Sequence, residues 1–277
     1  MSTKIIIDST VDLPDHLRER TTVIPLIVRF GEEEYQDGVT IDYQQFYEKL
    51  LTCKDLPCSS QPSPDTFETV YQSVTEAGDE AVVLTISSKL SGTYQSACIA
   101  AEDFPNIHVV DTMTATVAAG VLARYALKLA DDGLSAAAIA AKLEEEKCRV
   151  RLFAVLDSLE FLKRGGRLSA GAAMAGSLLN IKPVITLRDG VIEVVGKARG
   201  LRRGNAMMTE QVEHSGGIDT DLPVQFGFTG LSDELMRAYI ADNAELCPAD
   251  TPISPIGSVI GTHAGPGAYA IAFFSRK

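Results

Sequence analysis

The sequence lacks the glycine-rich motifs with which many enzymes hold nucleotides. It has no Gly-x-Gly-x-x-Gly fingerprint after a strand-like segment and no Walker A loop. The Gly-x-Ser-x-Gly elbow that presents the nucleophile of α/β-hydrolases is absent as well. These absences argue against a dinucleotide-dependent enzyme, a P-loop nucleotidase and an ordinary α/β-hydrolase. They leave open a catalytic serine and histidine that only the fold brings together.

Cysteine is scarce and follows no pairing pattern. The chain has five cysteines, an odd number, and no Cys-x-x-Cys pair, which is typical of reduced thiols in a cytosolic protein. Its four histidines show no metal-ligand spacing. We therefore expect a cytoplasmic protein with no bound metal and no cofactor.

Positive charge is in short supply, with 25 Lys and Arg against 37 Asp and Glu and a formal net charge of −12. Nucleic acids recruit clustered basic residues, so this balance argues against a nucleic-acid partner. One uncharged stretch, 252–275, is long enough to span a membrane. Its prolines and glycines predict strand, loop and strand instead of a spanning helix. The segment before the expected strand at residues 5–7, which follows Lys4, is too short for a signal peptide.

Short apolar segments alternate with amphipathic helical patterns through the first half of the 277-residue chain. This alternation predicts a parallel, doubly wound sheet. We expect the segment 150–156 to be the last strand of this half. The expected strands are residues 5–7, 23–30, 81–86, 107–110 and 150–156.

The second half has a different pattern. Segments 183–187 and 191–195 flank an Asp-Gly turn, which predicts an antiparallel hairpin. Further elements are expected as strands at 222–228, 256–260 and 269–274 and a helix at 232–246. We therefore predict an α/β fold of two domains. Residues 1–156 would form a Rossmann-like, doubly wound and mainly parallel sheet, and residues 157–277 an α/β domain with a mixed or antiparallel sheet.

Residues 168–179 are uncharged and mostly small. Small side chains let two helices pack tightly, or they leave room for a slender apolar ligand. Both interpretations stand at this point.

A cluster of hydroxyl side chains follows the expected strand 81–86. Ser91, Gly92 and Thr93 lie where this strand gives way to a helix, so free amides and hydroxyls point out of the turn. The helix dipole adds partial positive charge there, which suits an anionic oxygen. The alternative is that Ser91 is an ordinary helix N-cap.

Three further positions extend this candidate site. Ser59 and Ser60 precede a helix start at Ser63-Pro64, either as a second hydroxyl turn or as a solvated loop. His263 is expected in a glycine-flanked loop between two strands, facing a ligand or serving the structure alone. Asp8 follows the first strand, where it either faces a ligand or caps the next turn.

Together these motifs resemble those of the DegV family, and the likeness runs from end to end. The matching stretches are 8–14, 35–41, 60–64, 87–97, 159–167, 181–183 and 261–268. Each is weakly specific alone, whereas their order and spacing together are specific. The resemblance implies a two-domain α/β fold that holds one long-chain fatty acid between its domains. It also implies a likeness to the fatty-acid-carrying subunit of a bacterial fatty acid kinase. A separate ATP-binding kinase subunit would then phosphorylate the bound carboxyl group to an acyl phosphate.

The resemblance further implies which residues hold the carboxylate: the Ser91 hydroxyl with the turn at Gly92 and Thr93, the Ser59 hydroxyl, and His263. Family members commonly carry threonine where this chain has Ser59. The hydroxyl is kept and the methyl group is lost, so we expect binding to persist with looser packing around the head group.

Three basic residues, Arg167, Arg199 and Arg202, resemble family positions that face the kinase or the acyl phosphate. Judged from the residues themselves, the basic cluster at 197–203 receives a phosphate or an acidic partner, or it only adds solubility.

The expected energetics separate the acyl tail from the head group. About fourteen methylenes at roughly 0.8 kcal/mol each give on the order of 11 kcal/mol before the costs of binding. Two or three head-group hydrogen bonds add about 1–3 kcal/mol each. The tail should set affinity and the head group orientation. The resemblance thus implies a non-catalytic fatty-acid carrier in phospholipid metabolism. The alternatives are an acyl hydrolase or transferase that uses Ser91 and His263, and a lipid-sensing regulatory protein.

Overall fold

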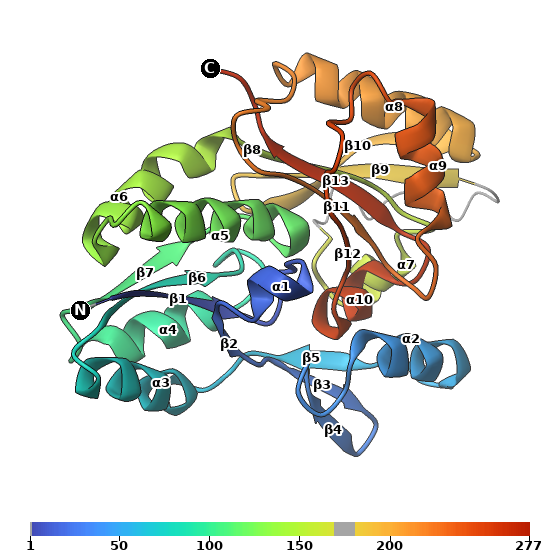
Figure 1. Cartoon of the computed structure of the whole chain (residues 1–277). Helices are drawn as coiled ribbons and strands as arrows, with labels where there is room; N and C mark the ends of the chain where they lie inside the picture. The colour runs from blue at the N-terminus through green and yellow to red at the C-terminus, as the bar shows by residue number, and fades with distance from the viewer. Residues whose placement is uncertain (1, 169–180) are drawn as a thin grey trace.

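The first sheet has four parallel strands, with helices on both faces (Figure 1). The computed structural model describes residues 2–168 and 181–277. The strand order is β2-β1-β6-β7, with β1 at Thr3–Asp8, β2 at Thr22–Ile24, β6 at Glu80–Thr85 and β7 at Ile107–Asp111. One face packs against α3 (Pro64–Glu76) and α4 (Thr93–Ala101), and the other against α5 (Thr116–Asp131) and α6 (Ala136–Glu146). The predicted doubly wound parallel sheet is confirmed.

The second sheet has six strands in the order β10-β9-β8-β13-β11-β12. Its pairs are antiparallel except β11 with β12, so it is mixed, as predicted. Its strands are β8 (Val150–Val155), β9 (Ile181–Arg188), β10 (Val191–Arg199), β11 (Val224–Phe228), β12 (Ile253–Pro255) and β13 (Tyr269–Phe274). Helices α8 (Leu201–His214) and α9 (Glu234–Asp242) cover its outer face. The predicted helix at 232–246 is therefore present but shorter.

The last strand predicted for the first half of the chain pairs with other strands than expected. The segment 150–156 was expected to complete the first sheet, whereas β8 pairs with β9 and β13 in the second. An apolar run indicates a strand that is buried on both faces, and β8 is buried between α5 and α8. Such a run carries no information about which sheet it joins. The second sheet thus begins on the N-terminal side of the predicted boundary at 156.

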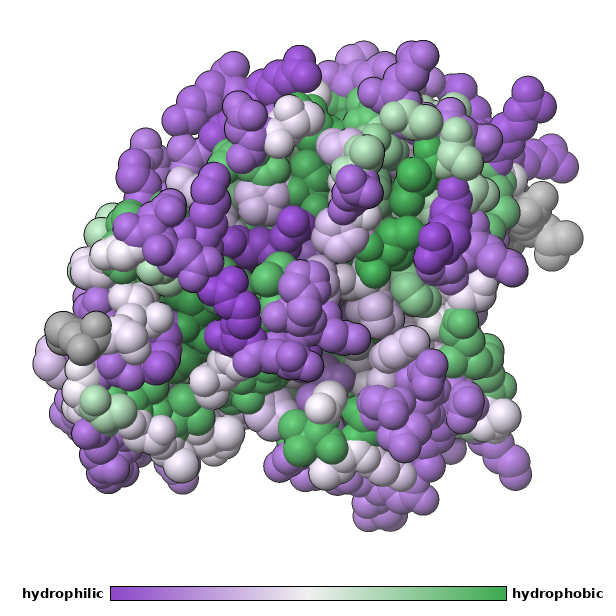
Figure 2. All heavy atoms as spheres, viewed as in Figure 1, coloured by the Kyte–Doolittle hydropathy of each residue, from purple (hydrophilic) through white to green (hydrophobic). Residues whose placement is uncertain are grey.

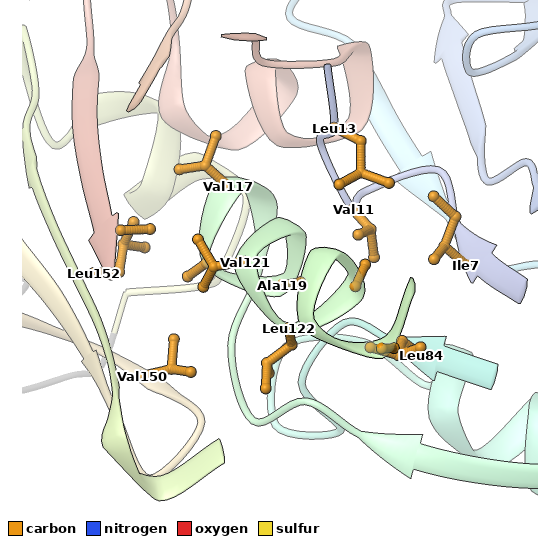
Figure 3. Packing of buried hydrophobic residues seen from close by; sticks show 14 of the residues in the cluster. Ile7, Val11, Leu13, Leu84, Val117, Ala119, Val121, Leu122, Val150 and Leu152 are labelled. Carbon is orange, nitrogen blue, oxygen red and sulfur yellow. The ribbon is translucent and has the colours of Figure 1, made fainter. Parts of the chain in front are cut away.

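Helix α5 joins the two sheets. Every residue from Thr116 to Ala123 is buried, which indicates a helix enclosed on all sides. Figure 3 shows its side chains between Val150 and Leu152 of β8 and Ile7 and Leu84 of the first sheet. This shared core fixes the spacing between the two sheets.

A small lobe is built from a third, antiparallel sheet and helix α2. The sheet has the order β4-β3-β5, with β3 at Ile27–Phe30, β4 at Glu33–Gln36 and β5 at Cys58–Ser60. The single strand predicted at 23–30 is wrong, because Pro25 separates β2 in the first sheet from β3 in the third. Helix α2 (Tyr43–Thr52) has Asp42 as its N-cap, with a capping box to Gln45.

The predicted strand at 256–260 is also wrong, because these residues lead into helix α10 (Ser258–Ala264). Val259 and Ile260 are β-branched, which favours a strand locally. Packing overrides this preference: a Cβ atom at Gly261 would lie 2.5 Å from the Tyr47 hydroxyl of α2. Glycine therefore lets the helix lie against α2. Figure 1 shows α10 between the second sheet and the small lobe.

The remaining elements are short. They are α1 (Asp15–Arg18), the 3-10 helix η1 (Lys147–Arg149) and α7 (Glu160–Arg164). The hairpin of β9 and β10 is confirmed, with Asp189 and Gly190 in the left-handed region. Apart from Leu168, the small-residue segment 168–179 lies outside the described residues.

The described surface is mostly hydrophilic on the face that Figure 2 shows, with smaller apolar areas between the polar side chains. Across residues 2–168 and 181–277, we find no helix with both the length and the apolar character needed to cross a membrane.

Candidate ligand-binding site

A cavity of about 280 Å³ lies between the carboxyl edge of the first sheet and the inner face of the second. Alternate residues of β8, namely Leu152, Ala154 and the following Leu156, face it. Ala154 pairs with Ala270 of β13 on one side and with Ile185 of β9 on the other, and all three line the cavity. Two alanines in one row of the sheet leave space where larger side chains would fill the interior.

Ser59 and His263 meet at the polar part of the lining. Ser59 is on β5 and His263 on α10, and the Ser59 Oγ lies 2.8 Å from the His263 Nε2. The Nδ1 atom is buried and has no hydrogen-bond partner in the described part of the chain. It lies against Gly165, where a Cβ atom would come within 2.1 Å of it. The expectation of a loop around His263 is therefore wrong, since a helix presents it.

The His263 imidazole is neutral near pH 7. Burial and the nearby Arg167 charge lower its pKa to about 4. A neutral imidazole carries one donor and one acceptor. If Nε2–H donates to the Ser59 oxygen, the Ser59 hydroxyl is free to donate to an anionic oxygen.

Arg167 is held in the lining by two backbone carbonyls. Its Nε donates to the Leu90 oxygen at 3.2 Å and its Nη1 to the Gly165 oxygen at 2.6 Å. Of the carboxylates in the described residues, none lies within ion-pair distance of it. The guanidinium therefore brings a positive charge to the cavity without a neutralising acid.

The hydroxyl turn after β6 completes the polar group. The Ser91 Oγ lies 2.9 Å from the Thr93 Oγ1, and Gly92, at the N-cap position of α4, lines the cavity beside Ser91. Thr93 is buried behind them and is not part of the lining. The bare Gly92 lets the Gln61 side chain lie against the turn, because a Cβ atom there would meet the Gln61 Oε1 at 2.0 Å. Gln61 is two residues from Ser59.

These contacts, with the neighbours along the chain, form a closed series of residues at the polar part of the cavity, here called the polar ring. It runs through residues 59, 263, 165, 167, 90, 91, 92 and 61. The arrangement suits a molecule with one anionic end and a long apolar body. It does not favour the alternative of an acyl hydrolase or transferase that pairs Ser91 with His263, because His263 contacts Ser59 and Ser91 contacts Thr93. A carboxylate that would orient His263 is likewise absent from the described partners of Nδ1.

The whole chain matches one protein family. The model of the DegV family covers residues 2–276. The chain belongs to the DegV family. A DegV domain-containing protein of Deinococcus radiodurans is 37% identical over 275 residues, which covers 98% of each chain.

Two solved structures share the fold and a ligand class. A fatty-acid-binding DegV family protein of Thermus thermophilus is 34% identical, with a TM-score of 0.89 over 100% of both chains. DegV of Bacillus subtilis, a fatty acid binding protein, is 31% identical, with a TM-score of 0.86 over 100% of both chains. The family and the α/β fold class implied by the sequence are thus confirmed, and DegV-family proteins bind fatty acids.

In this DegV chain, the predicted site residues fall into three groups, of which the first is Thr93 alone, buried next to Ser91 but outside the cavity lining. Ser59, Ser91, Gly92, Arg167 and His263 line one cavity. The other two predicted arginines, at positions 199 and 202, are exposed at the end of β10 and in α8, outside that lining.

Sequence reasoning missed part of the DegV site. Gln61 lies inside the matching stretch 60–64, which was the available signal for it. Ala154 and Ala270 carried no signal, because only strand pairing places two small residues side by side.

We predict that His263 makes the ligand-free protein sensitive to acid. An unfolded chain binds the imidazole proton near pH 6.5, and the folded protein does so only near pH 4. Folding stability therefore falls as the pH drops from about 6.5 to 4, by about 3 kcal/mol. Urea unfolding of the protein and of His263→Gln at both pH values isolates this effect. Equal acid losses in the two proteins would contradict it.

Proposed function

We propose that this chain binds one long-chain fatty acid, with the carboxylate in the polar ring and the acyl tail along the second sheet. One observation carries the proposal. The Arg167 guanidinium and the Ser59 and Ser91 hydroxyls border a cavity that is otherwise largely aliphatic, and no acid is among its described lining residues. The fatty-acid-binding relatives from T. thermophilus and B. subtilis support it.

The cavity and the energetics support a single extended ligand. A volume of about 280 Å³ is near the lower limit of roughly 300 Å³ for small-molecule pockets. Each methylene moved from water contributes about 0.8 kcal/mol, so the tail supplies most of the binding free energy. The ring then fixes which end of the molecule enters it.

We also propose that the chain performs no chemistry of its own. It presents the carboxylate to a separate ATP-binding kinase subunit, which forms the acyl phosphate in the cytoplasm for phospholipid metabolism. Hydroxyl donors and a guanidinium already engaged by two carbonyls leave carboxylate oxygens free to react. Arg199 and Arg202, both exposed, are the proposed contacts with that subunit.

Native mass spectrometry of the protein purified from a bacterial host tests the lipid proposal. We expect a mass increment that matches one fatty acid, with the ligand identified after extraction. The delipidated protein should take up one equivalent of palmitate or oleate. A protein that purifies empty and binds neither added acid would contradict the proposal.

The same preparation separates the carrier from a lipid sensor. The palmitate-loaded protein is incubated with ATP and a bacterial fatty acid kinase subunit, and acyl phosphate is trapped with hydroxylamine. A palmitoyl hydroxamate that requires all three components supports presentation to a kinase. Tight palmitate binding without any hydroxamate would favour the lipid-sensing alternative.

A further inference from the structure

Two buried carboxylates from distant parts of the chain hold the start of α10. Asp12, in the loop after β1, accepts the Gly257 N–H through Oδ1 at 2.9 Å. Asp37, just after β4, accepts the Ser258 N–H through Oδ1 at 3.0 Å. Both side chains are buried. The first amides of a helix have no partner within the helix, and these two acids supply one.

Asp12 also connects α10 to a second helix that borders the cavity. Its Oδ2 accepts the Thr116 hydroxyl at 2.6 Å. Thr116 is the first residue of α5 and lines the cavity. One carboxylate therefore sets the distance between the starts of α5 and α10.

Helix α10 depends on such contacts for its position. It has only seven residues, one of which is Gly261, and helices this short are not stable alone in water. A third contact at its start is the Tyr47 hydroxyl, which donates to the Ile256 oxygen at 3.1 Å. From this anchored start, α10 carries Val259 and His263 into the cavity lining.

We propose that Asp12 and Asp37 are positioning residues of the head-group site. By binding the first amides of α10, they hold His263 against Ser59. The inference rests on the proposed function in one respect, namely that His263 helps to hold the carboxylate of the fatty acid. If the hydrogen bonds of Asp12 and Asp37 to α10 are lost, α10 shifts and water reaches the His263 imidazole. The site then binds the carboxylate head group more weakly.

The electrostatics of the pair suggest a conservative replacement. Burial raises the pKa of Asp12 to about 7 and also raises that of Asp37, while the Arg18 charge opposes both shifts. A carboxyl that holds its proton near neutral pH resembles an amide in shape and in hydrogen bonding. Asparagine at position 12 can accept the Gly257 N–H through its amide oxygen and donate its amide N–H to the Thr116 hydroxyl oxygen. Asp12→Asn should therefore keep the hydrogen bonds to Gly257 and Thr116, whereas Asp12→Ala removes both.

The test follows the His263 side chain by NMR in the ligand-free protein, with its signals assigned through His263→Gln. We expect Asp12→Ala to raise the titration midpoint from about 4 toward 6.5, by about one unit or more, because the imidazole becomes hydrated. Asp12→Asn should stay near the starting value. Palmitate affinity should follow the same order, with the loss confined to the alanine variant.

A matched control is Asp8, an equally buried carboxylate at the last position of β1. It accepts the Thr10 and Ile86 amides, and among the described residues it makes no hydrogen bond to α10. We expect Asp8→Ala to leave the His263 midpoint unchanged, even where it lowers stability. An unchanged midpoint in Asp12→Ala, or an equal shift in Asp8→Ala, would overturn the proposal.

A second pair of variants covers the case in which Asp12→Ala does not fold. Asp37→Ala removes the contact with Ser258 and leaves Asp12 in place, and Asp37→Asn preserves it. A higher midpoint in the alanine variant alone supports the proposal, and equal midpoints refute it. The titration uses no ligand, so a failure to bind palmitate would remove the proposed function without deciding this point.

Discussion

Replacing Arg167 with methionine is expected to weaken palmitate binding roughly 10- to 100-fold. A hydrogen bond to a charged group contributes about 1.5–3 kcal/mol, and each 1.4 kcal/mol is a factor of ten. Arg167 has no acidic partner among the described residues, so no surplus carboxylate is left behind when its charge is removed. Methionine keeps much of the side-chain length and the apolar contact. Isothermal titration with delipidated protein measures the change.

The uncharged alcohol hexadecanol separates the head group from the tail. We expect Arg167→Met to leave hexadecanol binding within about twofold, because the alcohol carries no charge for the guanidinium to meet. Arg164→Met is the control, since Arg164 is exposed, pairs with Glu160 and lies outside the cavity lining. It should bind both ligands normally. An equal loss for acid and alcohol in Arg167→Met would show that the residue supports the fold of the cavity and not the carboxylate.

The parts of the site that the sequence predicts are those with local signals. A strand that ends in a run of hydroxyls before a helix is visible in twelve residues, which is why Ser91 could be placed at a sheet edge. Ser59 carries a similar signal, although it proves to lie in a strand, β5, instead of a loop. Arg167 entered only through the resemblance to the family. No local pattern relates it to Leu90, whose carbonyl it binds from 77 residues away.

The parts that the sequence does not predict depend on contacts between distant segments. The strand pattern of β8 is clear, but its partners are far from each other in sequence. Strand β9 follows β8 after α7, whereas β13 is the last strand of the chain and comes after α8, α9 and α10. The β-branched Val259 and Ile260 favour a strand. The fit of Gly261 against Tyr47 and the carboxylates at the start of α10 make a helix there. Tertiary packing therefore decides where His263 is presented, and local propensity does not.

Replacing Ala270 with leucine is expected to block the cavity without harming the fold. Ala270 of β13 is buried and faces the cavity beside Ala154. Leucine adds three carbon atoms, which take the space of about three methylenes of the acyl tail. At roughly 0.8 kcal/mol each, palmitate affinity should fall about 60-fold. The new side chain fills empty space, so the free energy of unfolding should stay within about 1 kcal/mol of the starting value.

Ala272 provides a comparison on the same strand, two residues further along. It is also fully buried, but it packs in the core of α5 and the two sheets and is not part of the cavity lining. Ala272→Leu overfills packed space and should lower the free energy of unfolding by about 1–3 kcal/mol, with palmitate affinity little changed in the folded fraction. Urea unfolding and palmitate titration of the two variants should thus give opposite patterns. If Ala270→Leu binds palmitate as tightly as the parent protein, the acyl tail does not run along this row of the sheet. The small side chains of Ala154 and Ala270 would then have to be explained by packing alone.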